Sequence, residues 1–112
     1  MKDFLQQLKT SPETVQFENT MAIIDANYQF TPCEFSNGDL VNAENQNNGS
    51  CKIFAFARLH ELPEQQTLHC FGDYYRIDVL ENPDGTDHQN IRNFMKLGWA
   101  GISFNANPLI NK

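Results

Sequence analysis

Hydrophobic residues recur with the period of a helix near the start of the chain. One side of a short amphipathic segment carries Phe4, Leu5 and Leu8. A longer run with the same period continues at Phe17, Met21, Ile24 and Tyr28. Ser11 offers a capping oxygen and Pro12 fits the first helical position, so the pattern predicts a helix over residues 12–27. Thr31-Pro32 prevents any continuation of that helix.

The pattern changes around Asn37-Gly38, a dipeptide that tolerates the positive φ of a two-residue hairpin turn. We therefore expect a small β-hairpin in which Phe35 and Leu40 face one another. Near the end of the chain, residues 101–104 alternate between apolar and polar and predict one more short strand. Residues 108–112 are expected to form a tail that packs lightly or not at all.

The most hydrophobic stretch runs from Cys51 to Leu59 and is apolar nearly all round, which predicts a central buried helix. Leu62-Pro63 ends it, and a further helix is expected from Pro63, with Gly72 as a break or kink. The apolar face of that further helix consists of Leu68, Phe71, Tyr75 and Val79.

The last predicted helix follows a turn at Asn82-Pro83-Asp84-Gly85. Thr86 and Gln89 match a capping box, and Gly98 is expected to end the helix. Its inner face consists of Ile91, Phe94 and Met95. Together these patterns predict a mainly α fold: one compact domain over residues 1–112, with about five helices and one small β-hairpin.

The charge balance is acidic, with 14 Asp and Glu against 8 Lys and Arg and a formal net charge of −6. The basic residues are scattered, so we expect no binding to nucleic acid. No segment is long and apolar enough for membrane insertion, and the first residues lack the apolar run of a secretory signal. These features predict a cytoplasmic protein.

Three cysteines, Cys33, Cys51 and Cys70, are odd in number and widely spaced, which argues against a disulfide framework. Cys51 would stand at a helix N-terminus, where a thiol pKa can be lowered. We nevertheless expect all three to be buried structural residues, because cysteine is among the most buried residue types.

The densest group of reactive side chains spans the last turn and helix start: Asp78, Asp84, Asp87, His88, Asn90 and Arg92. A helix N-terminus presents free amides and a partial positive charge, so an anion or a general-base histidine could be used there. Helix capping and surface ion pairs alone also account for these residue types.

No known catalytic motif is present: the chain has no P-loop, no G-x-G-x-x-G, no G-x-S-x-G and no H-E-x-x-H. His60 and His69 do not stand at metal-ligand spacing from another histidine or from a cysteine. We therefore expect neither a metal nor a cofactor.

Several strings, taken in order, carry a family resemblance: Tyr28–Pro32, Phe35–Gly38, Asn48–Phe56, Thr67–Leu80, Pro83–Met95 and Gly98-Trp99. Over nearly the whole chain they resemble the HopJ type III effector family of bacterial proteins. The resemblance implies a bacterial protein, and the family name implies secretion by a type III system. It brings no reaction or catalytic residue with it.

The functional expectation is therefore a protein that binds another protein or a small polar ligand. The expected binding residues lie on a polar surface and are Asn37, Asp78, Asp84, Asp87, His88, Asn90 and Arg92. The alternative is a small hydrolase or lyase in which His88 is the base and Asp84 or Asp87 orients it. That alternative requires His88 to lie beside a concave pocket with a carboxylate within hydrogen-bond reach.

Overall fold

A computed structural model describes residues 1–112. The helices are α1 (Lys2–Thr10), α2 (Phe17–Asn27), α3 (Asn48–Leu59), α4 (Glu64–His69) and α5 (Gln89–Leu97), with a π-helical segment η2 (Tyr74–Val79) and two short 3₁₀ turns, η1 (Pro12–Thr14) and η3 (Gly98–Gly101). The strands are β1 (Tyr28–Phe30), β2 (Phe35–Asn37), β3 (Leu40–Asn42), β4 (Ile102–Phe104) and β5 (Leu109–Asn111). The predicted mainly helical class is confirmed, because 54% of the residues are helical. The predicted count of about five helices and one small hairpin is somewhat off, because there are six helices and the strands form two small sheets, one of two strands and one of three.

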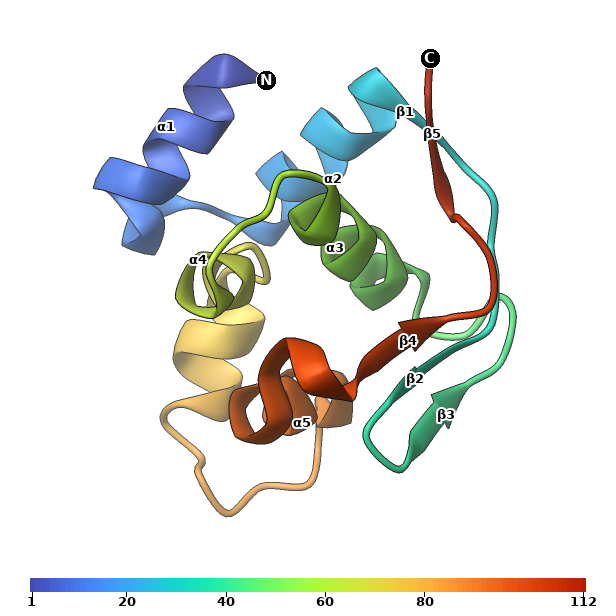
Figure 1. Ribbon diagram of the computed structural model, residues 1–112. Coiled ribbons are helices and arrows are strands. Elements are labelled where there is room, and N and C mark those ends of the chain that lie inside the picture. Colours follow the sequence, from blue (N-terminus) through green and yellow to red (C-terminus); the bar gives the residue numbers. More distant parts are fainter.

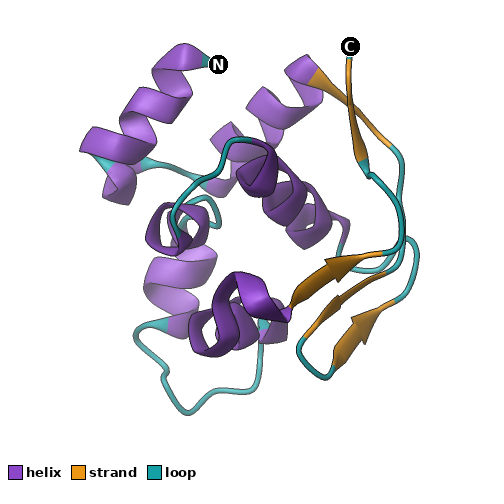
Figure 2. Ribbon diagram, viewed as in Figure 1, coloured by secondary structure: helices purple, strands orange, loops and turns teal.

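Helix α3 is the centre of the molecule, as its apolar sequence predicts (Figure 1). The other helices and the strands surround it, with the strands gathered on one side (Figure 2). Phe54 of α3 is fully buried, and its ring centroid lies 5.0 to 6.4 Å from those of four aromatic residues: Phe35, Phe71, Phe94 and Trp99. Edge-on and tilted ring pairs of this kind add to the stabilisation from burial.

The helix predicted over residues 12–27 begins later than expected, at Phe17. Pro12 does start a helical turn, but only the short η1, because Val15 becomes extended and is fully buried. Gln16 and Asn19 then cap α2 reciprocally. The guanidinium of Arg76 donates hydrogen bonds to the carbonyl oxygens of Pro12 and Val15, which fixes this break in place.

The predicted hairpin is present, but its turn is shifted by one residue. Asn37 pairs with Leu40, so the loop is Gly38-Asp39, and Phe35 faces Asn42 instead of Leu40. Gly38 has a φ of +63°, the left-handed conformation that glycine adopts without strain. The predicted strand at residues 101–104 is confirmed as β4, which pairs with β2 to complete a three-stranded sheet.

The C-terminal tail is packed, contrary to expectation. Strand β5 pairs antiparallel with β1, and Leu109 is only 2% exposed. Residues 108–112 show no clear periodicity of apolar residues, so the sequence alone does not predict that they form a strand. Their order follows from pairing with β1. Gly72, in contrast, breaks its helix as predicted, with a φ of +61° between α4 and η2. No helix in the structure has the length and apolar character needed to cross a bilayer.

Candidate functional site

Helices α3 and α5 begin at residues with left-handed backbone conformation. Asn47 precedes α3 with φ 53° and ψ 47°, and His88 precedes α5 with φ 51° and ψ 49°. Neither residue makes a side-chain capping bond. The predicted capping box is therefore wrong: Gln89 donates to the Thr86 carbonyl oxygen, but the helix starts only at Gln89. First-turn N–H groups without a side-chain cap are free to bind other acceptors.

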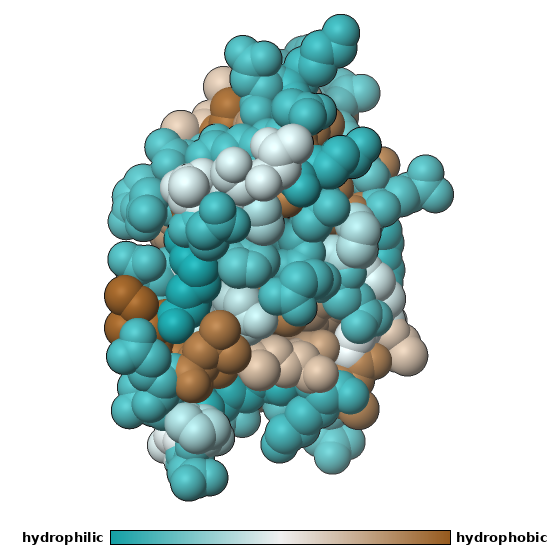
Figure 3. Space-filling model, turned by 90° about the vertical axis from the view of Figure 1, so that its left-hand side faces the viewer, coloured by the Kyte–Doolittle hydropathy of each residue, from teal (hydrophilic) through white to brown (hydrophobic).

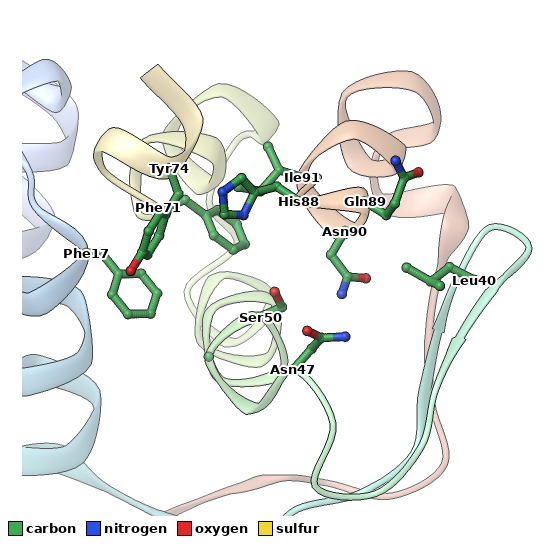
Figure 4. A pocket seen from close by; sticks show the side chains of 11 residues that line it. Phe17, Leu40, Asn47, Ser50, Phe71, Tyr74, His88, Gln89, Asn90 and Ile91 are labelled. Atoms are coloured by element: carbon green, nitrogen blue, oxygen red, sulfur yellow. The ribbon is translucent and has the colours of Figure 1, made fainter. Parts of the chain in front are cut away.

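The two helix starts share a pocket of about 350 Å³. Its lining comes from α2, β3, α3, the segment after α4, and the start of α5: Phe17, Leu40, Asn47, Gly49, Ser50, Phe71, Tyr74, His88, Gln89, Asn90 and Ile91. In Figure 4 the aromatic rings lie on one side, Leu40 lies on the other, and polar side chains lie between them. Ser50 makes no side-chain hydrogen bond within the chain, so its hydroxyl remains available to a ligand.

Four asparagine side chains connect the hairpin to both helix starts. The Asn42 Oδ1 atom accepts hydrogen bonds from Asn47 at 2.7 Å and from Asn90 at 2.9 Å. The Asn90 Oδ1 atom accepts from Asn37 and from Asn42, each at 3.1 Å. Asn37, Asn42 and Asn90 are buried, and all of their side-chain nitrogen and oxygen atoms except Asn37 Oδ1 have a hydrogen-bond partner, as buried amides require. This asparagine network fixes the distance between the two helices that form the pocket.

A group of acidic and histidine side chains lies at the edge of the pocket. The His88 Nε2 atom is 3.0 Å from Asp78 Oδ2 and 3.8 Å from Asp87 Oδ2. The His88 ring also packs against Tyr74, with ring centroids 5.1 Å apart. Asp78 reaches His88 from η2, ten residues earlier in the chain. The structure therefore joins three of the predicted site residues, Asp78, Asp87 and His88.

Arg92 organises the loop before α5 rather than facing the pocket. It donates from Nε to the Asp87 carbonyl oxygen at 2.6 Å and from Nη1 to the Asn82 carbonyl oxygen at 2.9 Å. Its Nη2 atom lies 2.6 Å from Asp87 Oδ1. The hydrogen bond from Arg92 lowers the pKa of the Asp87 carboxyl group, with smaller effects of the charges on Arg92 and His88 in the same direction. Arg92 is 8% exposed, so we assign it a structural part in holding the loop.

Two predicted residues lie apart from this group. Asn37 is fully buried in the asparagine network, so the expectation that it lies on the surface is wrong. Asp84 is exposed and makes no hydrogen bond or ion pair. Asp78 therefore takes the place beside His88 that the sequence suggested for Asp84 or Asp87. Met95, expected on the inner face of α5, is 45% exposed.

The pocket also contains residues that sequence reasoning missed, notably Phe17, Asn47 and Ser50. The amide-rich run Asn42–Gly49 was the available signal, because a loop of asparagines next to a buried helix needs partners for its amides. The cysteines are free and buried, as expected. The idea of a low-pKa Cys51 is wrong: burial, with a contribution from neighbouring Cys33, raises the pKa of the Cys51 thiol to about 12.

Comparison with known proteins agrees with the resemblance seen in the sequence. The family model described as "HopJ type III effector protein" matches residues 1–109. The chain belongs to the HopJ type III effector protein family. A crystal structure of VPA0580, described as a protein of unknown function, superposes on this HopJ chain with a TM-score of 0.98 and 54% sequence identity. The match covers 100% of this chain and 93% of the other. No curated protein matches the chain.

Proposed function

We propose that this HopJ protein binds a small polar ligand in the pocket between α3 and α5. The observation that carries the proposal is the meeting of two uncapped helix starts at one pocket. The partial positive charge of each helix start favours a ligand with hydrogen-bond acceptors or negative charge. The volume of about 350 Å³ is within the range of small-molecule sites.

The other pocket residues define which kind of ligand would fit. Ser50 and His88 offer polar side-chain atoms from opposite helices. Phe17, Phe71 and Tyr74 provide an aromatic wall for a flat or apolar part of the ligand. A small molecule with an acidic or carbonyl end and a planar body meets both requirements.

The test is a screen of small polar metabolites against the purified chain by two-dimensional NMR, followed by calorimetry of each hit. We expect hits to shift the amide signals of residues 47–50 and 88–91. Binding should be lost in Ser50→Tyr, which fills the pocket, and weakened in His88→Ala. Asp84→Ala is the matched control, because Asp84 lies in the neighbouring loop without a partner. Hits that bind all variants equally, or shift other regions, would reject the pocket as the site.

A hydrolase or lyase is the second candidate, favoured by the 3.0 Å contact of His88 with Asp78 at the pocket edge. In this arrangement Asp78 orients the imidazole ring and His88 acts as a base toward a bound substrate. The candidate predicts that any turnover found in a substrate screen disappears in His88→Ala and falls in Asp78→Asn. Turnover unchanged in both variants would assign the reaction to other residues.

Protein binding is the third candidate. Tyr74 and Ile77 of η2, and Leu80 directly after it, are each more than 40% exposed. Figure 3 shows hydrophobic side chains gathered in the lower part of a mainly hydrophilic face on this side of the molecule.

Delivery into a host, which the family name implies, is tested separately with a translocation reporter fused to the chain. A reporter that stays inside the bacterium would show that the name does not describe this member.

A further inference from the structure

Three side chains at the pocket edge have the donor types and spacing of a metal site. One nitrogen from His88 and one oxygen each from Asp78 and Asp87 all lie within 4.8 Å of one another. Metal–ligand bonds of about 2.0–2.2 Å separate two donors by about 3 Å at a right angle and about 3.5 Å at a tetrahedral angle. The His88 Nε2 atom lies 3.0 Å from Asp78 Oδ2 and 3.8 Å from Asp87 Oδ2, which is close to these values.

We propose that Asp78, Asp87 and His88 bind a divalent transition-metal ion such as Zn²⁺ or Mn²⁺. A mixed set of one imidazole and two carboxylates suits these ions, whereas Ca²⁺ and Mg²⁺ prefer oxygen donors alone. The ion takes the place of the proton between Nε2 of His88 and Oδ2 of Asp78. That proton moves to Nδ1 of the ring or to solvent.

The three donors are held by different parts of the fold, which distinguishes them from a chance group of surface acids. Asp78 belongs to η2, whose π-helical turn is a rare conformation. His88 is held by the left-handed start of α5. Arg92 is buried and binds Oδ1 of Asp87, so that Oδ2 remains toward His88. Residues that orient ligating carboxylates in this way are a regular part of metal sites.

Three protein donors leave at least one coordination position of the ion open. Because His88 also lines the pocket, water or a ligand in the pocket can take that position. The metal site is nevertheless independent of the proposed pocket ligand. It requires only side chains of this chain, and it is tested with metal ions alone.

The experiment is calorimetric titration of the chelator-treated full chain with ZnCl₂ and with MnCl₂. We expect one ion per chain, and at least about a tenfold loss of affinity in each of Asp78→Asn and His88→Gln. Asp84→Asn is the matched control, since it removes one carboxylate from the same loop without touching the three donors. Its affinity should equal that of the wild type. Circular dichroism confirms that each variant remains folded.

A second measurement locates the ion without mutation. Bound Mn²⁺ broadens nearby NMR signals, so the signals of His88 and Asp78 should disappear first, before those of His60 and His69. The proposal is overturned if neither ion binds, if Asp84→Asn weakens binding as much as Asp78→Asn, or if the broadening centres on another histidine.

Discussion

Substitution of Asn42 by alanine tests whether the asparagine network holds the two helix starts in position. Asn42 is 1% exposed and uses both atoms of its amide group. Its nitrogen donates to the Phe35 carbonyl oxygen and to Asn90, and its oxygen accepts from Asn47 and Asn90. Alanine removes all four hydrogen bonds and leaves the Asn90 side-chain nitrogen buried without an acceptor.

The cost follows from that unpaired donor. A buried donor left without a partner costs about 1–3 kcal/mol, and the lost hydrogen bonds and the small cavity add to it. Asn47 is exposed and can turn to water, so its lost bond costs little. We expect a loss of about 3 kcal/mol in the free energy of unfolding, or about 12 °C in Tm for a domain of this size.

The assay is urea unfolding followed by circular dichroism, with Asn48→Ala as the control. Asn48, the first residue of α3, follows Asn47 and makes no side-chain hydrogen bond, so its substitution should cost less than about 0.5 kcal/mol. A double-mutant cycle of Asn42 and Asn90 should show coupling of at least about 1 kcal/mol. If Asn42→Ala costs no more than Asn48→Ala, the network does not determine the geometry of the pocket.

Three further results are expected. Gly72→Ala should cost at least about 1–2 kcal/mol in urea unfolding, because Gly72 has a φ of +61° and an added Cβ would lie 2.6 Å from the Phe17 backbone nitrogen. Burial raises the pKa of the Cys51 and Cys70 thiols to about 12, so both should react with a thiol reagent at mildly alkaline pH only after unfolding; labelling of either in the folded chain would contradict this. Burial lowers the pKa of His60 below its ordinary value of 6.5, so near and below pH 6.5 the unfolded chain binds more protons than the folded chain. The free energy of unfolding should therefore fall as the pH drops below 6.5. Thermal unfolding at several pH values should show a weaker fall in His60→Gln than in the wild type.

The sequence predicted elements well where a local signal decides the structure. The apolar run at Cys51–Leu59 predicted the buried helix α3, and Gly38, Gly72 and Gly98 each have a positive φ. The predictions failed where contacts with a segment distant in sequence determine the local structure. Val15 is pulled into an extended conformation by burial and by Arg76, which lies 61 residues away. The tail is ordered only because β1 offers it a partner.

The candidate site, too, could be predicted only where its residues are close together in the sequence. The group around His88 was visible because Asp87, His88 and Arg92 are close in sequence. Which carboxylate faces His88 depended on η2, whose π-helical form brings Asp78 to the ring and cannot be seen in a periodicity of 3.6 residues. The pocket itself was missed, since its walls come from segments between Phe17 and Ile91.

The structure also gives a physical reason for the high asparagine content of the chain. Thirteen asparagines are an unusual number for a domain of this size, and three of them are buried in one network. Asn47, the residue that precedes α3, directs its amide into this network and does not cap that helix. No side chain caps either of the two helix starts that border the pocket.

We expect the fold and the proposed metal site to vary separately in this family. The backbone superposes on that of VPA0580 with a TM-score of 0.98 although the two sequences are 54% identical, so many side chains can change without altering the fold. Residues of the asparagine network hold helices together, and their loss should weaken folding. Asp78 is partly exposed and its carboxylate contacts only His88, so its loss should leave folding nearly unchanged while weakening the metal site. A HopJ protein that keeps the network but lacks the Asp78 carboxylate should therefore fold like this one and bind a transition metal at this position at least about tenfold more weakly.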